Sequence, residues 1–122
     1  IGKKYDVILC MEVIEHVDNV DLFVESCAKL LNKNGLIFFS TINRNPKSYL
    51  FAILGAEYVL RWLPIGTHDW KKFLKPEEII NHVSPHFLIH KETKGVTFNP
   101  IFNKWKLSND ISVNYMSYFV KN

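Results

Sequence analysis

The chain has 122 residues, of which 48% are hydrophobic and 22% charged, and its formal net charge is +3 at pH 7. This length fits one domain with a real core, and the ordinary composition excludes wholesale disorder. The lysines are scattered, and Arg44 and Arg61 are the only arginines, so bidentate reading of base edges has little material and no nucleic-acid partner is expected. Cys10 and Cys27 form no CxxC motif, which predicts two reduced, buried thiols.

The first part of the chain predicts a strand, a helix and a second strand. Residues 5–11 contain a continuous apolar run, which is typical of a parallel strand buried on both faces. Asp18 or Asn19 can cap a helix with one apolar stripe, and Asn34-Gly35 is predicted to end it. Residues 36–41 are a second buried-type strand, so the three elements predict a right-handed, parallel βαβ unit.

The second half of the chain predicts two helices and three strands. Residues 49–63 predict a largely apolar helix, and Lys75-Pro76-Glu77-Glu78 is a helix start, with proline in the first turn and two acids near the positive end of the helix dipole. Residues 87–90 and 96–98 are predicted as short strands. Residues 111–120 alternate apolar with polar and predict the last strand.

Glu12, Glu15 and His16 follow the first strand directly. Strand ends in open α/β sheets are where ligands bind, and groups three or four apart on a helical turn share one face. Two carboxylates and an imidazole suit magnesium, manganese or zinc. The residues alone leave two alternatives open: a solvated helix start with a hydrogen-bonded histidine, and His16 acting alone as a general base. Met11 at the strand end either contacts a flat ring or packs in the core.

The apolar segment 49–63 also has two interpretations. It is too short to span a bilayer, which needs about twenty residues. Basic flanks, including Arg44, Lys47 and Lys71, favour a helix on an anionic membrane surface or a lid, and the alternative is a buried core helix. His68 in Thr67-His68-Asp69 is either oriented by Asp69 or an ordinary loop histidine.

Several of these segments resemble the ubiquinone biosynthesis O-methyltransferases, class I enzymes that use S-adenosylmethionine. The resemblance covers essentially the whole chain, and its most specific segments are residues 39–45 and 66–73. The segments that carry it are Asp6-Val7-Ile8-Leu9-Cys10-Met11-Glu12-Val13-Ile14-Glu15-His16-Val17, Phe39-Ser40-Thr41-Ile42-Asn43-Arg44-Asn45, Gly55-Ala56-Glu57-Tyr58, Gly66-Thr67-His68-Asp69-Trp70-Lys71-Lys72-Phe73, Asn99-Pro100 and Val113-Asn114-Tyr115-Met116.

The resemblance implies an α/β, partial Rossmann-like fold. The family has a seven-stranded doubly wound sheet, and residues 1–122 would supply its fourth to seventh strands, the last one antiparallel. Residues 46–65 would form an inserted helical segment that contacts a membrane. The N-terminal half of the single domain, which holds the cofactor's glycine-rich loop, has no counterpart here.

The resemblance also implies a reaction and its residues. The family transfers a methyl group from S-adenosylmethionine to a hydroxyl of a polyprenyl catechol or demethylubiquinol. Met11, with Cys10 beside it, would lie at the adenine side of the cofactor. Glu12, Glu15 and His16 would hold magnesium, and Glu12 and His16 would be catalytic, because a catechol hydroxyl is mostly protonated near neutral pH and must lose its proton to attack.

The implied partners are a polyprenylated quinone precursor, a membrane surface reached through residues 47–63, and other ubiquinone-biosynthesis proteins. The implied location is peripheral, at the cytoplasmic face of the bacterial inner membrane, or alternatively at the matrix side of the mitochondrial inner membrane.

Without the glycine-rich loop, the isolated chain is expected neither to bind S-adenosylmethionine well nor to methylate. The alternative function is that of an inactive split-gene fragment that binds a membrane surface or a partner. Residues 6–10 would present an unprotected sheet edge, which predicts self-association.

Overall fold

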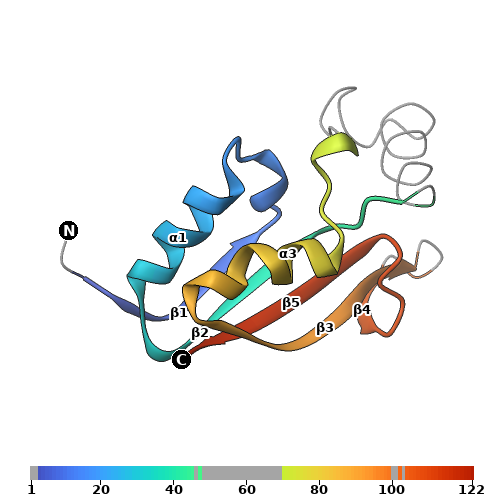
Figure 1. Ribbon diagram of the computed structural model, residues 1–122. Coiled ribbons are helices and arrows are strands. Elements are labelled where there is room, and N and C mark those ends of the chain that lie inside the picture. Colours follow the sequence, from blue (N-terminus) through green and yellow to red (C-terminus); the bar gives the residue numbers. More distant parts are fainter. Residues whose placement is uncertain (1–2, 46, 48–69, 100–101, 103) are drawn as a thin grey trace.

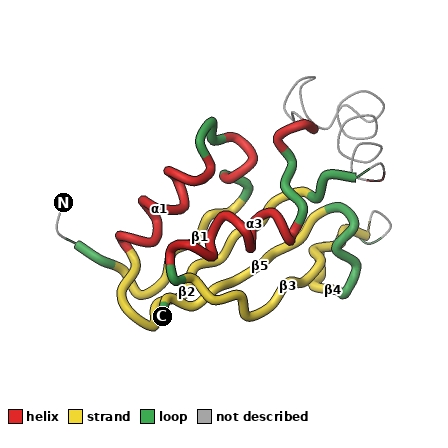
Figure 2. The backbone as a smooth tube through the Cα atoms, viewed as in Figure 1, coloured by secondary structure: helices red, strands yellow, loops and turns green. Residues whose placement is uncertain are grey.

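The computed structural model describes residues 3–45, 47, 70–99, 102 and 104–122. Five strands form one sheet in the order β1-β2-β5-β3-β4, and helices α1 and α3 pack on the same face of it (Figures 1 and 2). Short 3₁₀ turns lie at Ile14–His16, Trp70–Lys72 and Ser84–His86. The main elements are β1 Tyr5–Met11, α1 Val20–Leu30, β2 Leu31–Ile42, α3 Pro76–Val83, β3 Leu88–Asn99, β4 Lys104–Ser108 and β5 Asn114–Lys121.

The sheet has a mixed topology that sets which strand ends meet. β1 and β2 are parallel, with Met11 opposite Ser40, and β5 runs antiparallel to both β2 and β3. The predicted parallel strand-helix-strand unit and the antiparallel last strand are therefore confirmed. Because β1, β2 and β3 run in the same direction, their carboxyl ends lie at one edge of the sheet.

The ends of the first helix follow local chemistry. The side chain of Asn19 accepts a hydrogen bond from the Leu22 N–H at 3.0 Å, as expected of an N-cap. The helix ends at Leu30, however, and β2 begins at Leu31 rather than near residue 36. The prediction of a helix up to Asn34-Gly35 was wrong because Leu31, which completes the apolar spacing, is already paired with Tyr5 of β1.

The main core lies between the two helices and the face of the sheet that they cover. Phe39 and Phe119 meet edge to face at 5.9 Å between ring centres. The buried Tyr115 hydroxyl donates to the Leu74 carbonyl at 2.5 Å, and burial raises its pKa far above its usual range. Cys10 and Cys27 are free and buried, as predicted. The larger core members are Val24, Leu31, Ile37, Phe39, Ile79, Val83, Tyr115 and Phe119.

The prediction that β1 is buried on both faces was wrong. Val7 is 51% exposed and Leu9 64%, because β1 is an edge strand and both described helices lie on the opposite face. The uncovered face continues over β2 and β5, where Phe38 and Tyr118 stack at 5.2 Å. The apolar run correctly predicted a strand but not what covers it.

The C-terminal strands also differ from the prediction. The two short strands expected at 87–90 and 96–98 are one strand, β3, and β4 is a strand that the sequence patterns did not predict. A register shift between His90 and Glu92 breaks the alternation that a sequence search relies on. The last strand begins at Asn114 rather than 111.

The inserted segment 46–65, apart from Lys47, and Thr67-His68-Asp69 lie outside the described residues. No helix in the described part is long and apolar enough to cross a membrane.

Gly95 of β3 is required by a close approach of the chain to itself. A Cβ placed there would lie 1.8 Å from the Asp110 carbonyl oxygen, which belongs to the loop between β4 and β5. We expect Gly95→Ala to lower the free energy of unfolding by about 1–3 kcal/mol, because backbone atoms must shift to admit the methyl group. Urea unfolding measures this, with Lys91→Ala at an exposed strand position as the control. Equal stability of the two variants would contradict the close approach.

Candidate functional site

The candidate site begins where β1 ends. Glu12 has a left-handed backbone, with φ at 57°. Its N–H donates to the Ser40 carbonyl at 2.9 Å and lies 3.2 Å from the Ser40 hydroxyl oxygen. Non-glycine residues adopt this conformation at a cost of about 1 kcal/mol or more, and such residues gather at functional sites. The turn takes the chain off the sheet and into the 3₁₀ turn that carries Glu15 and His16.

Glu15 and His16 lie in different environments although they are neighbours. Glu15 is 4% exposed, and its Oε2 accepts a hydrogen bond from the buried Thr41 hydroxyl at 2.7 Å. The His16 side chain is 54% exposed, and its Nε2 lies 3.8 Å from Glu15 Oε1. The turn therefore buries Glu15 and leaves His16 at the surface, although both are predicted metal ligands.

Glu12 and Glu15 form a coupled acidic pair. Partial burial of the Glu12 carboxyl, the negative charge of Glu15 and a hydrogen bond with Glu15 together raise the pKa of Glu12 to about 7. Contacts with Ser40 and Asn114 oppose the rise. The Ser40 hydroxyl lies 3.5 Å from Glu12 Oε1. Two acids that cannot both ionise easily make a place where a proton or a cation is favoured.

The structure brings together part of the predicted set. Glu12 and Glu15 converge, whereas His16 turns outward, so in the described residues no three His, Cys, Asp or Glu side chains stand close enough to hold a metal ion. Met11 is 37% exposed at the strand end, and Cys10 is buried with its thiol against that of Cys27. Their assignment to the adenine side stays a prediction.

Sequence reasoning missed three residues of this site as functional groups: Ser40, Thr41 and Asn114. For Ser40 and Thr41 a signal was available, because these two adjacent hydroxyl residues end the predicted strand 36–41. The βαβ prediction places that strand beside the strand 5–11, which leads to Glu12. Because β5 reaches the site only through antiparallel pairing with β2, with Ile42 opposite Asn114, no local pattern points to Asn114.

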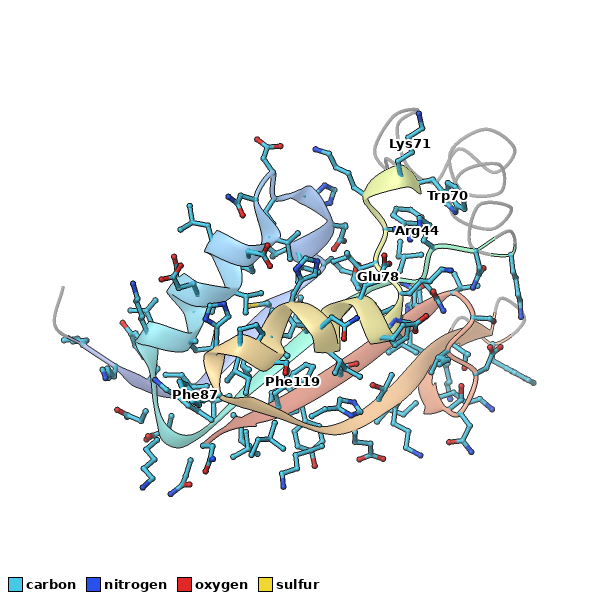
Figure 3. The ribbon with its side chains drawn as sticks, viewed as in Figure 1. Arg44, Trp70, Lys71, Glu78, Phe87 and Phe119 are labelled. Carbon is cyan, nitrogen blue, oxygen red and sulfur yellow. The ribbon has the colours of Figure 1, made fainter. Side chains whose placement is uncertain are left out.

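A second polar cluster fixes the segment that follows β2. Arg44 donates from Nη2 to Glu78 Oε2 at 2.8 Å, and Figure 3 shows both side chains. Arg44 also donates from Nη1 to the Phe73 carbonyl at 3.1 Å. Burial alone would raise the pKa of Glu78, but hydrogen bonds from the Lys75 N–H and from Arg44 outweigh it and lower the pKa. Trp70 Nε1 donates to the Asn45 carbonyl at 3.1 Å. These contacts join the two ends of the 46–69 segment to each other and attach Arg44 to α3.

Thr41→Val should lower the free energy of unfolding by about 1–3 kcal/mol, because the buried Glu15 carboxylate loses its hydroxyl donor. Thr41→Ser keeps the donor and should recover most of the loss. Chemical unfolding of both variants measures this, and equal losses in the two would show that shape rather than the hydrogen bond matters.

Glu12 should make stability depend on pH. Its folded pKa of about 7 exceeds the ordinary value of 4.5, so folding takes up a proton between these limits. The free energy of unfolding should therefore fall as pH rises from 5 to 8, by on the order of 1 kcal/mol. Urea unfolding in a chelator measures the slope. Glu12→Gln should remove most of it, Glu25→Gln on the exposed side of α1 should keep it, and an unchanged slope in Glu12→Gln would contradict the assignment.

Known proteins place this arrangement in a family. A model described as "Methyltransferase domain" matches residues 2–90. The chain is 54% identical over 120 residues to the ubiquinone biosynthesis O-methyltransferase of Pelagibacter ubique, covering 98% of this chain and 50% of that protein. It is 52% identical over 115 residues to the protein of that name from Bartonella tribocorum, covering 94% of this chain and 47% of the relative. The chain thus spans about half the length of the curated relatives it matches.

Solved structures agree on the fold. A crystal structure of a Thermotoga maritima SAM-dependent methyltransferase, titled a "possible histamine N-methyltransferase", superposes with a TM-score of 0.66 at 14% identity, covering 100% of this chain and 60% of that chain. The mixed sheet, with its antiparallel β5 between β2 and β3, is therefore the class I methyltransferase arrangement that the sequence predicted. On the family match and this fold, the chain belongs to the methyltransferase domain family.

Proposed function

We propose that this chain is part of an enzyme that transfers a methyl group from S-adenosylmethionine to a hydroxyl of a polyprenyl catechol or demethylubiquinol. The observation that carries the proposal is the 54% identity to a named O-methyltransferase of ubiquinone biosynthesis, over 98% of this chain. The similarity favours this function over the alternative of an inactive, membrane-binding or partner-binding fragment.

In the proposal, a divalent cation, magnesium, is held at the end of β1 by two carboxylates that already converge and by His16, which would have to turn inward to complete the set. The Glu12 and Glu15 carboxylates provide hard oxygen ligands and share a charge that burial makes costly. Ser40 and Thr41 orient these carboxylates in the way that hydrogen-bonding partners orient metal ligands. His16, exposed and next to Glu15, is the proposed third ligand. When bound, the cation would favour the ionised form of a substrate hydroxyl.

The residues themselves have separate tasks in this proposal. Glu12, with a pKa of about 7, is suited to take up a proton near neutral pH. His16 is the alternative general base, because its imidazole is exposed to the solvent side of the turn. Thr41 holds Glu15 in place. Met11, exposed where β1 ends, would contact the adenine ring of the cofactor. Once the hydroxyl is ionised, methyl transfer depends mainly on positioning.

The proposed setting is a membrane surface, because a polyprenylated substrate resides in a bilayer. Residues 47–63 would make the contact, at the cytoplasmic face of a bacterial inner membrane. The matrix side of the mitochondrial inner membrane is the alternative. Val7 and Leu9 on the exposed edge strand support self-association or pairing with a further chain.

Removal of one carboxylate tests the site in the natural gene product. Glu12→Gln and Glu15→Gln should lower kcat/KM for methyl transfer by about 100-fold or more, because ionisation of the hydroxyl loses its support. The control is Glu25→Gln, whose carboxylate only pairs with Lys29 on α1. A methylation assay with a short-chain catechol measures the effect. Activity within threefold of wild type in both variants would contradict the role of the pair.

Cation binding can be tested without catalysis. Manganese titration of the chain, followed by electron paramagnetic resonance, should give an affinity that Glu12→Gln and Glu15→Gln each lower by about 10-fold to 100-fold. His16→Ala should weaken binding if the imidazole is a ligand. Equal binding by wild type and both glutamine variants would contradict the cation site and leave the methyltransferase proposal to the activity assay.

A further inference from the structure

Two cysteine side chains from different elements meet in the core of the protein. Cys10 lies in β1 opposite the buried Phe39 of β2, on the face of the sheet that the helices cover. Cys27 lies on the buried side of α1, together with Val24 and Ala28. All of these residues belong to the same hydrophobic core cluster. The fold therefore places a thiol of the first strand against a thiol of the helix that follows it.

The two thiols interact with each other directly. Their side chains share a hydrogen bond, which lowers the pKa of the Cys27 thiol although burial opposes this effect. The hydrogen bond from Cys10 thus stabilises a thiolate at Cys27, and the thiolate is the form that reacts with oxidants. The sequence has 2 cysteines, so within these 122 residues each is the other's only thiol partner. The pair therefore combines an attacking sulfur with a second sulfur in contact with it.

The cysteine pair lies at the margin of the core, where some of its surface remains exposed. Cys10 is 5% exposed and Cys27 8%, whereas Val24 and Leu31 of the same cluster are completely buried. β1 is an edge strand, and its one neighbour in the described sheet is β2. The small exposed surface favours attack on a small oxidant over attack by a thiol of another protein molecule, which favours a bond within the chain.

The position of the pair connects it to the candidate site. Glu12, Glu15 and His16 all lie between Cys10 and Cys27 in the sequence. A bond between the two sulfurs would close residues 11–26 into a loop that contains this acidic turn. It would also tie the end of β1 to α1 on either side of the turn. Oxidation of the pair would thus restrain the turn that carries the two carboxylates.

We propose that Cys10 and Cys27 are a redox modification site that forms a reversible disulfide, with hydrogen peroxide as the oxidant. The Cys27 sulfur attacks one peroxide oxygen, the O–O bond breaks, and the released hydroxide leaves with the thiol proton as water. The Cys10 sulfur then attacks the sulfenic acid at Cys27, the S–O bond breaks, and hydroxide leaves with the Cys10 proton as a second water. Two thiols are oxidised to one disulfide, and one peroxide is reduced to two waters. The inference goes beyond the proposed function and requires neither its substrate nor a cation.

Peptide mapping of the peroxide-treated natural gene product tests the bond without any substitution. Trypsin leaves both cysteines in the single peptide 5–29, and Glu-C protease then separates Cys10 from Cys27 at the glutamates between them. We expect the two resulting peptides to stay joined after peroxide treatment, to resist alkylation, and to separate after addition of dithiothreitol. Oxidation of Met11 adds an oxygen atom, so mass distinguishes it from the loss of two hydrogens. Free thiols after treatment, oxidation of one cysteine alone, or a bond of either cysteine to a different thiol would each overturn the proposal.

Matched serine variants test the order of attack. Cys10→Ser keeps a hydroxyl donor beside Cys27 but cannot complete the disulfide, so the sulfenic acid at Cys27 should persist and react with dimedone. In Cys27→Ser, dimedone labelling of Cys10 should be lower by about tenfold or more, because the attacking sulfur is absent. Circular dichroism verifies the fold of both variants, and the mapping of the unaltered protein decides the bond if either fails to fold. Equal labelling of the two variants, or stronger labelling of Cys27→Ser, would overturn the assignment of Cys27 as the attacking sulfur.

Discussion

The parallel pairing of β1 with β2 fixes the level at which both strands end, and the candidate site depends on this level. With Met11 opposite Ser40, the next N–H, that of Glu12, reaches both the carbonyl and the hydroxyl of Ser40. The same register brings Thr41 to the buried Glu15. A slip of one residue would exchange the faces of every side chain on the strand and separate both carboxylates from their hydroxyl partners.

Holding the Glu12 and Glu15 carboxylates close together destabilises the fold. Hydrogen bonds from Ser40 and Thr41 offset only part of this free-energy cost. Glu15 is buried with one described hydroxyl donor, and the pKa of Glu12 rises to about 7 because the two negative charges and partial burial act together. Sites that tolerate such a cost are usually functional, because stability alone would favour a neutral residue. By contrast, the Arg44–Glu78 pair has matched charges and lowers the pKa of its acid, as a stabilising contact does.

Sequence patterns predicted what depends on near neighbours in the chain. The strand at 5–11, the Asn19 cap and the Pro76 helix start are all local, and all were found. The exposure of Val7 and Leu9 depends on which elements cover each face, and strand β4 depends on pairing with β3, so neither follows from periodicity. At the site, spacing correctly suggested that Glu12 and Glu15 meet. It could not show that His16 turns outward, because a 3₁₀ turn places adjacent residues on different sides.

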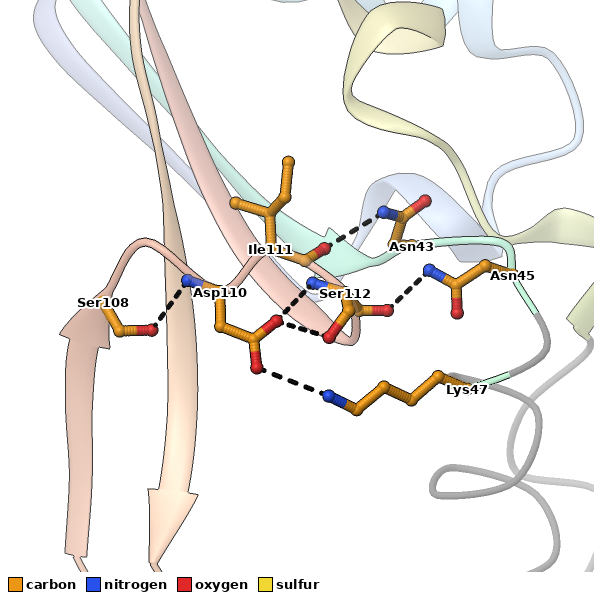
Figure 4. Close-up of polar contacts among 7 residues, drawn as sticks. All are labelled: Asn43, Asn45, Lys47, Ser108, Asp110, Ile111 and Ser112. Carbon is orange, nitrogen blue, oxygen red and sulfur yellow. Dashed lines mark hydrogen bonds and ion pairs between the residues drawn. The ribbon is translucent and has the colours of Figure 1, made fainter.

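The two faces and the edge of the sheet have separate physical roles. One face holds the core, no described helix covers the other, and the polar groups of the candidate site lie where β1 and β2 end. Glu12 lies there, the chain leaves the sheet there through Asn43 and Asn45, and β3 ends at the same edge. Asn45 donates to the Ser112 carbonyl and Lys47 pairs with Asp110 (Figure 4), so the loop after β4 is attached to the segment by which the chain leaves the sheet beside the acidic pair.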